Sequence, residues 1–184
     1  MTGFEALHAD AARVLAGWVP PDPAQAGLRD EYLAFLGAHP DAMSRGCRVG
    51  HLTASTLVMD EPRRRVLLTL HPKVGRWLQL GGHCEVDDAS LRDAAIREAI
   101  EESGISEVTM SAAPARLDRH PVPCGPGPLS EHLDVQYLAT VPADAQEVIS
   151  HESDDLRWFA IDDLPDGLDA AVLALIRQAT ASPA

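Results

Sequence analysis

The sequence predicts an α/β domain, with a mixed β-sheet between helices, that follows an N-terminal helical segment. Three observations support this fold class. Short apolar runs rich in β-favouring residues recur between residues 49 and 161. One well-capped helix, over residues 91–103, interrupts these runs, and an amphipathic helix over Leu168–Ala179 follows the last of them. Strands on both sides of a central helix, with a second helix at the end, are typical of a mixed sheet packed between helices.

The helical segment occupies residues 1–45. Apolar residues recur with helical spacing over 4–18 and again over 28–36, and a proline-containing turn follows each stretch. We interpret this pair of helices as an extension that either packs against the following domain or forms a dimer contact. Residues 46–184 are then the main domain.

The strands are predicted from apolar runs bounded by turn residues. His51–Met59 and Arg65–Leu70 flank a turn at Asp60-Glu61-Pro62, so we expect these two strands to form a hairpin. The remaining predicted strands follow the central helix: Val108–Met110, Leu133–Val141 and Leu156–Ile161. Between them, Ala115–Val122 is interpreted as either a strand or an extended segment.

Charge and composition argue against several classes of partner. The formal net charge is −13, whereas a nucleic-acid-binding surface is expected to carry a basic patch. The same charge argues against an anionic membrane surface, and no apolar run reaches the ~18–20 residues of a transmembrane helix. The three cysteines, Cys47, Cys84 and Cys124, are irregularly spaced and suggest no disulfide framework. Residues 1–10 also lack the pattern of a signal peptide, so we expect a cytoplasmic protein. From its charge and hydropathy we expect it to bind neither nucleic acid nor membranes.

The central helix carries three glutamates close together. Glu98 and Glu102 project from one side of this helix and Glu101 lies at the edge of that side, opposite the apolar residues. Like charges at this spacing repel one another unless a positive group lies between them. A divalent cation is a natural partner, because Mg²⁺ takes oxygen ligands and is often held by a few carboxylates plus substrate phosphates.

The residues around this helix strengthen the metal hypothesis. Gly81-Gly82 follows a short apolar run and precedes the helix, and glycines let the backbone approach a ligand closely. Asp88 and Ser90 are both candidate N-caps, and Gly104 is placed to end the helix. The segment is therefore predicted to be a strand, a glycine loop and a capped helix.

This pattern resembles the signature of the Nudix hydrolase family. That signature is Gly, five residues, Glu, seven residues, Arg-Glu, an aliphatic residue, any residue, Glu-Glu, any residue, Gly and an aliphatic residue. Here five residues separate Gly82 from Asp88, and the stretch from Arg97 to Ile105 supplies the end of the pattern. There are three departures from this signature. The first acid is an aspartate, Asp88, rather than a glutamate, and eight residues rather than seven separate it from Arg97. Ala99 replaces a larger aliphatic residue. We expect the extra residue to lie in the loop or in the first helical turn, and Asp88 would then cap the helix or reach the metal through water.

The resemblance implies an α/β/α sandwich that hydrolyses a diphosphate linked to another group, usually a nucleoside, with the help of one to three Mg²⁺ or Mn²⁺ ions. By motif position, the implied metal ligands are Glu98 and Glu102, then Glu101, and the backbone carbonyl of Gly81. Arg97 is implied to orient the glutamates through a two-pronged hydrogen bond. The expected partner is a small phosphorylated substrate, and a homodimer is possible.

The resemblance leaves the general base open between a signature glutamate and an acid on a separate loop. Among the acids outside the signature we favour Glu152, with Glu131 and Asp134 as rivals. Cys84 follows the glycine pair, but no base is paired with it in the sequence, so we interpret it as a small loop residue rather than a nucleophile.

Two further residues are candidate substrate contacts. His83 follows Gly82 directly and would touch phosphate or a metal-bound water, or else pack within the loop. Trp77 would stack on a base, or else pack in the core or at its rim. Three other histidines also lie near the predicted site in the sequence: His71, His120 and His132.

Two alternatives remain within the same fold family. One is a sensor that binds a nucleotide without cleaving it, and the intact Glu98, Glu101 and Glu102 argue against it. The other is an enzyme like isopentenyl diphosphate isomerase, of which Cys84 is a weak sign. The signature does not select a substrate, because specificity in this family depends on loops outside it.

Overall fold

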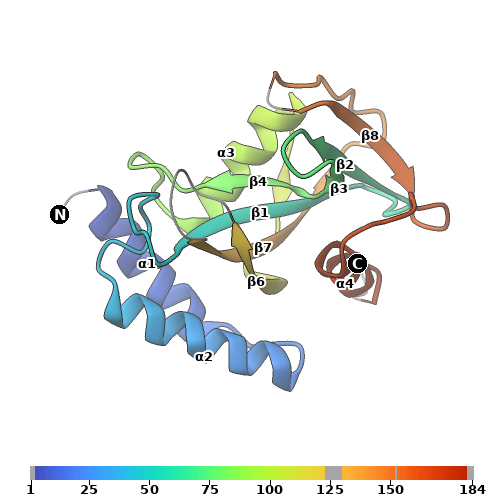
Figure 1. Ribbon diagram of the computed structural model, residues 1–184. Coiled ribbons are helices and arrows are strands. Elements are labelled where there is room, and N and C mark those ends of the chain that lie inside the picture. The colour runs from blue at the N-terminus through green and yellow to red at the C-terminus, as the bar shows by residue number, and fades with distance from the viewer. Residues whose placement is uncertain (1–2, 123–129, 152, 182–184) are drawn as a thin grey trace.

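The central feature of the computed structural model is a curved mixed sheet with helices on both faces (Figure 1). The structure describes residues 3–122, 130–151 and 153–181. The helices are α1 (Gly3–Gly17), α2 (Pro23–Ala38), α3 (Leu91–Ser103) and α4 (Ala170–Ala181). The strands are β1 (His51–Asp60), β2 (Arg65–His71), β3 (Arg76–Leu78), β4 (Leu80–His83), β5 (Thr109–Met110), β6 (Arg116–Val122), β7 (Ser130–Val141) and β8 (Asp155–Ala160). The predicted mixed sheet between helices is therefore confirmed.

Strand β1 lies at the centre of the sheet and is buried along its whole length. It runs parallel to β7 and antiparallel to β2 and β4. The pairing of β1 with β2 confirms the predicted hairpin. Strands β3 and β8 extend the sheet beyond β2, and β5 and β6 extend it beyond β7. The parallel β1–β7 pair joins segments far apart in the chain and brings the start of β7 beside the start of β1.

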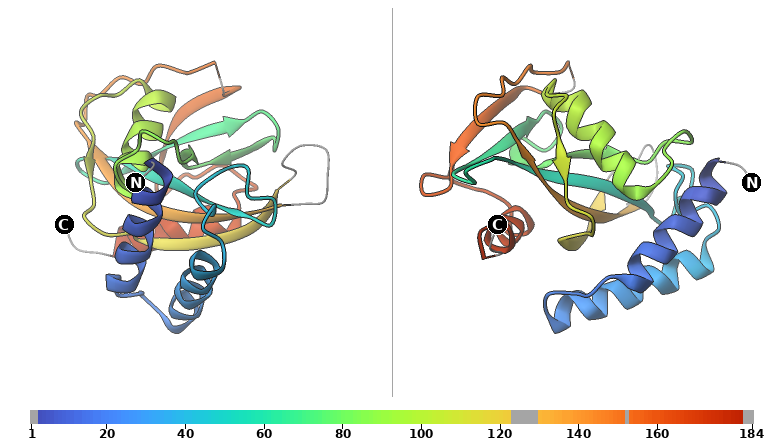
Figure 2. Two further views of the ribbon diagram at one scale, coloured as in Figure 1. Left: turned by 90° about the vertical axis from the view of Figure 1, so that its left-hand side faces the viewer. Right: turned by 180° about the vertical axis from the view of Figure 1, so that it is seen from behind.

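Two apolar clusters hold the layers together. One cluster joins α3, one face of β1 and β7, and the N-terminal helices. The other joins α4 to the opposite face of β1 and to β2. Alternation along β1 explains the division, because Leu52 and Ala54 belong to the first cluster and Leu57 and Met59 to the second. Helices α3 and α4 thus cover opposite faces of the sheet, as the two views of Figure 2 also show.

The N-terminal helices pack against the domain that follows them. Leu7 and Leu15 of α1 and Leu36 of α2 lie in the same buried cluster as Leu91 and other α3 residues. The hydroxyl of Tyr32 donates to the backbone carbonyl of Asp118 in β6 at 2.6 Å. Of the two interpretations of residues 1–45, the structure shows packing; the domain boundary near residue 45 stays a prediction.

Two local predictions need correction. Helix α2 begins at Pro23 rather than near residue 28, because Asp22 caps it by accepting from the amide of Gln25 and proline is tolerated at the first helical position. The predicted glycine loop is instead strand β4, in which Gly81 and Gly82 pair with β1. The short length of β4 and its two glycines gave no strand pattern in the sequence.

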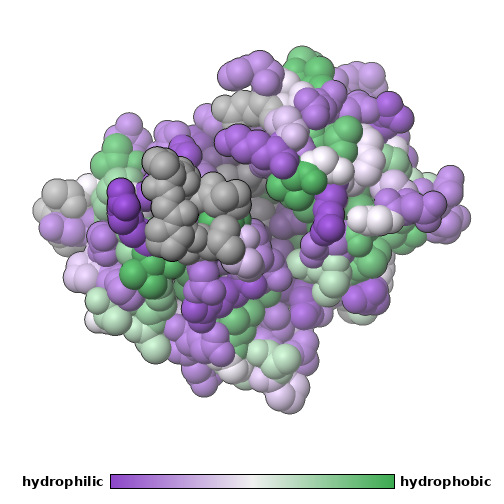
Figure 3. Space-filling view, in the orientation of Figure 1, coloured by the Kyte–Doolittle hydropathy of each residue, from purple (hydrophilic) through white to green (hydrophobic). Residues whose placement is uncertain are grey.

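The outer surface is mainly polar on the face shown in Figure 3, where hydrophobic residues lie in small separate groups. None of the described helices is long and apolar enough to cross a membrane.

Candidate active site

Helix α3 is a regular helix with a defined cap at each end. The Ser90 side chain accepts from the amide of Asp93, and Gly104 ends the helix in the left-handed conformation at φ 68°. Of the two predicted places for the extra residue of the variant signature, the loop and the first turn, the structure therefore shows the loop before the helix. Asp88 does not cap the helix, so that alternative is wrong and Ser90 is the cap.

The glutamates of α3 meet the glycines of β4. The Gly81 amide donates to Glu102 Oε2 at 2.8 Å. A Cβ atom at Gly82 would lie 2.6 Å from Glu98 Oε1, so the missing side chain makes room for this carboxylate. The two glycines and the two glutamates thus form one compact group, as the resemblance to Nudix hydrolases implies.

Arg97 connects this group to the loop before α3. Its Nε and Nη2 atoms donate to the two carboxylate oxygens of Asp88, each at 3.0 Å. Its Nη1 atom donates to Glu98 and to Glu101, also at 3.0 Å each. The hydrogen bonds to Asp88 are the main cause that raises the pKa of Arg97 above its usual range. The two-pronged bond that was predicted for the glutamates is made with Asp88 instead.

The two glutamates beside Arg97 differ in exposure. The side chain of Glu98 is 13% exposed, whereas that of Glu101 is 58% exposed. Glu98 is therefore held between Arg97 and Gly82, and Glu101 stands at the open edge of the group.

The two predicted substrate contacts lie away from the glutamates. The Trp77 ring packs edge-on against Phe159 of β8, with ring centroids 4.8 Å apart, in the apolar cluster of α4. The backbone carbonyl of His83 accepts from Arg97. Side chains of successive strand residues point to opposite faces of a sheet. The side of Gly82 on which a Cβ would lie faces Glu98, so the ring of His83 lies on the opposite face of the sheet. Contact of either residue with a substrate stays a prediction.

The candidate general bases fall in different places. Glu152 lies outside the described residues, as does Cys124. Glu131 accepts from Arg119 at 2.9 Å on the neighbouring strand. Asp134 is buried on the face of β7 away from α3, and the desolvation of its carboxylate raises its pKa.

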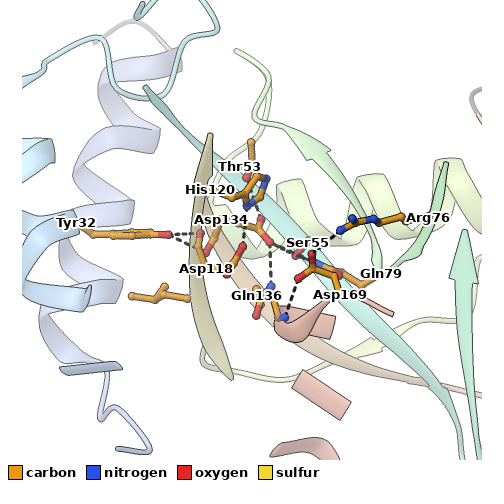
Figure 4. A network of polar contacts seen from close by, with 12 residues as sticks. Tyr32, Thr53, Ser55, Arg76, Gln79, Asp118, His120, Asp134, Gln136 and Asp169 are labelled. Carbon is orange, nitrogen blue, oxygen red and sulfur yellow. Dashed lines mark hydrogen bonds and ion pairs between the residues drawn. The ribbon is translucent and has the colours of Figure 1, made fainter. Parts of the chain in front are cut away.

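Asp134 holds a polar network that the sequence did not predict (Figure 4). Thr53 and Ser55 of β1 donate to its two oxygens at 2.9 and 2.6 Å. Longer contacts at 3.3 Å come from Gln79 and Gln136. A carboxylate so fully hydrogen-bonded fixes β1 against β7.

Three histidines meet beside this network: His51, His83 and His132. Burial is the main cause that lowers their pKa, to about 4 for His83 and about 3 for His132, so the rings are neutral near pH 7. Sequence reasoning overlooked His51. Its signal was the matching start of two strands, His-x-Thr-x-Ser at residue 51 and His-x-Asp-x-Gln at residue 132.

Cys84 is not placed as a nucleophile. Its side chain is buried, and burial raises the pKa of its thiol to about 12. This agrees with its interpretation as a small loop residue rather than a nucleophile and argues against the isomerase alternative.

Comparison with known proteins agrees with this geometry. The model of the Nudix domain matches residues 50–178. The chain therefore belongs to the Nudix family. It is a pyrophosphohydrolase of the Nudix type, because the domain, the fold and the intact glutamates of α3 all agree. A comparison with curated proteins found no match.

Solved structures share the fold. A Nudix-family hydrolase from Clostridium perfringens is 27% identical, with 70% of this chain and 95% of that chain covered and a TM-score of 0.56. Dihydroneopterin triphosphate pyrophosphohydrolase from E. coli is 16% identical, with 69% and 92% covered and a TM-score of 0.57. The Nudix domain of Shewanella oneidensis NrtR, complexed with ADP ribose, is 22% identical, with 83% and 96% covered and a TM-score of 0.53. At such identities the last two show the fold alone.

Proposed function

We propose that the protein hydrolyses a diphosphate linkage in a nucleoside diphosphate-type or related small molecule, and that the reaction requires Mg²⁺ or Mn²⁺. The observation that carries this proposal is the meeting of Glu98 and Glu102 with Gly81 and Gly82. Two helix carboxylates lie against backbone that no side chain shields. This arrangement offers charged oxygen atoms at one point of the surface.

The residues at this point fit a hard divalent cation. Every atom that would bind the ion is an oxygen, and clustered carboxylates favour a positively charged partner. Glu98 and Glu102 would hold the ion, with Glu101 and the Gly81 carbonyl as further ligands. When bound, such an ion lowers the pKa of a water molecule and offsets the charge of phosphate oxygens.

Arg97 and Asp88 hold the carboxylates of the site in a fixed orientation. Arg97 fixes Glu98 and Glu101 by one hydrogen bond each, and Asp88 in turn fixes the guanidinium of Arg97. A preorganised set of charges loses little free energy to rearrangement during the reaction. Arg97 is therefore a positioning residue, and the proposed general base is Glu101 or Glu152.

A nucleotide substrate is the class to test first. The structure of the Shewanella oneidensis Nudix domain contains ADP ribose, in which a diphosphate joins adenosine to ribose. A cytoplasmic location and a homodimer stay predictions from the sequence.

The experiment is a substrate panel with purified protein in Mg²⁺, with released phosphate and pyrophosphate measured. The panel contains ADP ribose, NADH, nucleoside triphosphates, dinucleoside polyphosphates and non-nucleotide diphosphates. We expect turnover of at least one diphosphate, loss of turnover in excess chelator, and recovery with added Mg²⁺ or Mn²⁺. Glu102→Gln should reduce kcat by about a hundredfold or more, on the scale of one preorganised charged group.

The matched control is Glu61→Gln, which makes the same chemical change in an exposed turn. It should stay within twofold of wild type. Full activity in excess chelator, or a Glu102→Gln variant as active as the control, would contradict the proposal.

A further inference from the structure

Three strands bring three imidazoles to one point on the sheet face that α3 does not cover. His51 begins β1, His132 lies beside it in register on β7, and His83 ends β4 opposite Thr53. Residues two apart on a strand share a face, so all three rings lie on the same side of the sheet. Their ring centroids are 4.9 to 5.0 Å apart in every pairing.

The ring nitrogens face one another across a small space. One nitrogen of each histidine lies within 4.8 Å of the other two. His51 is 1% exposed, and both of its ring nitrogens, together with Nε2 of His83, are buried with no hydrogen-bond partner among the described residues. A buried polar atom without a partner costs about 1–3 kcal/mol, so native proteins rarely leave several together unless a ligand satisfies them.

The donor set selects the class of ligand. Three neutral imidazoles offer nitrogen lone pairs and no negative charge, which suits zinc and neighbouring transition metals better than Mg²⁺. Zinc binds nitrogen at about 2.0–2.1 Å, so tetrahedral ligands lie about 3.4 Å apart. Ring shifts of about 1 Å would bring the three nitrogens to that spacing.

A fourth histidine lies beside these three. His120 of β6 lies in register with His132, and their ring centroids are 5.5 Å apart. Its Nδ1 is 2.7 Å from an oxygen of Asp118, so this histidine is already paired with a carboxylate and is not counted among the ligands (Figure 4). Thr53 and Asp134, which are hydrogen-bonded to each other, lie next to the group of His51, His83 and His132, called the histidine trio below.

We propose that His51, His83 and His132 form a second metal site, which binds one zinc-class ion and is separate from the carboxylate site on α3. Three protein ligands leave one tetrahedral position open for water or for a substrate oxygen. The ion would cross-link β1, β4 and β7. Because the His83 carbonyl also accepts from Arg97, the same cross-link would fix the end of β4 that faces the glutamates.

The test measures metal binding directly, in protein without a histidine tag. After removal of metals, the wild type is titrated with Zn²⁺ by calorimetry and with Co²⁺ by visible absorption, which reports tetrahedral nitrogen ligands. We expect one ion per chain and a rise of several degrees in Tm with Zn²⁺. His132→Ala and His51→Ala should lose the absorption band and weaken zinc binding by at least a hundredfold, while His71→Ala, a histidine outside the trio, should match wild type.

Two further variants separate this site from other ligand groups. Glu102→Gln should reduce kcat by about a hundredfold or more and leave the Co²⁺ band unchanged, which distinguishes failure of this proposal from failure of the proposed function. A second group, formed by His39, Asp41 and Cys47, also places potential ligand atoms within 4.8 Å of one another. Cys47→Ser should therefore bind zinc as wild type does.

The proposal would be overturned if zinc bound with unchanged affinity to folded His51→Ala and His132→Ala, or if only Cys47→Ser or Glu102→Gln lost it. If the histidine variants fail to fold, long-range ¹H–¹⁵N NMR spectra of the wild-type imidazoles decide the question. Zn²⁺ should shift the ligating nitrogens of His51, His83 and His132 and no other histidine. Unshifted signals from these three would equally refute the site.

Discussion

Arg97 and Asp88 form a two-pronged ion pair, in which Nε and Nη2 each donate to one carboxylate oxygen at 3.0 Å. Asp88 occupies the first acidic position of the variant signature, and its side chain is only 5% exposed. It also accepts from the Glu85 amide at 2.7 Å. The shorter acid is thus fully hydrogen-bonded where the usual signature has a glutamate, and it holds the guanidinium of Arg97 in place.

Asp88→Glu restores the usual signature residue, yet we expect it to destabilise the protein. The extra methylene must fit where Asp88 already makes three hydrogen bonds in a buried position, and overpacking of this kind costs about 1–2 kcal/mol. Urea unfolding measures the loss. Asp93→Glu, the same change at an exposed position, should stay within about 0.5 kcal/mol of wild type. A raised unfolding midpoint for Asp88→Glu would show that this position tolerates the longer acid.

Glu98→Gln should reduce turnover more than Glu101→Gln. Glu98 is enclosed between Arg97 and Gly82, whereas Glu101 is mostly exposed and water can replace part of its contribution. We expect losses in kcat of about a hundredfold or more and about tenfold, respectively, on the scale of preorganised charged groups. Steady-state kinetics at saturating Mg²⁺ on the best substrate measures both. The reverse order would make Glu101 rather than Glu98 the main metal ligand, or would favour Glu101 over Glu152 as the general base.

The two glycines of β4 should respond differently to alanine. In Gly82→Ala the atoms nearest to the new Cβ would be those at the end of the Glu98 side chain, with Oε1 at 2.6 Å, so activity should fall while the fold persists. In Gly81→Ala the backbone has φ +152° and the new Cβ would lie 2.5 Å from Ser55 Cα, so the strand itself must shift. Thermal unfolding and kinetics on both variants test this. Equal losses of Tm would contradict the distinction.

Stability of the metal-free protein should fall on mild acidification, in part through His83 and His132. Burial lowers their pKa to about 4 and about 3 in the folded protein, whereas both titrate near 6.5 in an unfolded chain. Between these values the unfolded chain binds more protons. The contribution of the two rings is therefore complete above pH 6.5 and is lost as the pH falls toward 4.

Each ring contributes less than about 1.4 kcal/mol per pH unit, because both are partly exposed. Urea unfolding in chelator from pH 7.5 to 4.5 measures the slope. His132→Asn should flatten the curve relative to wild type. His120 acts in the opposite sense, because its hydrogen bond to Asp118 raises its pKa. Parallel curves for wild type and His132→Asn would contradict the prediction.

Tyr32→Phe should weaken the attachment of α2. Tyr32 is fully buried, and its hydroxyl donates to backbone carbonyls of Asp118 and Asp134 at 2.6 and 3.2 Å (Figure 4). Removal of the hydroxyl leaves a buried acceptor without its donor, at a cost of about 1–2 kcal/mol. Urea unfolding measures this cost, and kcat should stay near wild type. An unchanged unfolding midpoint would show that packing alone attaches the helix.

The features of the site that follow local sequence patterns could be predicted from the sequence. The spacing of Glu98 and Glu102 places them on one side of α3, and Ser90 and Gly104 bound that helix, because helical period and caps depend on residues at most a few positions apart. The mixed sheet and the family also follow from such patterns. These patterns identified the chemical groups but not all of their partners.

Only the tertiary structure determined which residues meet across the sheet. Strand β4 exists because Gly81 and Gly82 pair with β1, and the pairing of Arg97 with Asp88 depends on the path of the intervening loop. The histidine trio depends on the register of β1 with β7, two paired strands that lie far apart in the sequence. Register is fixed by burial of one face and by the connections, and a shift of one residue would send every side chain to the opposite face. Local periodicity contains no information about such a register, so these contacts follow from the fold.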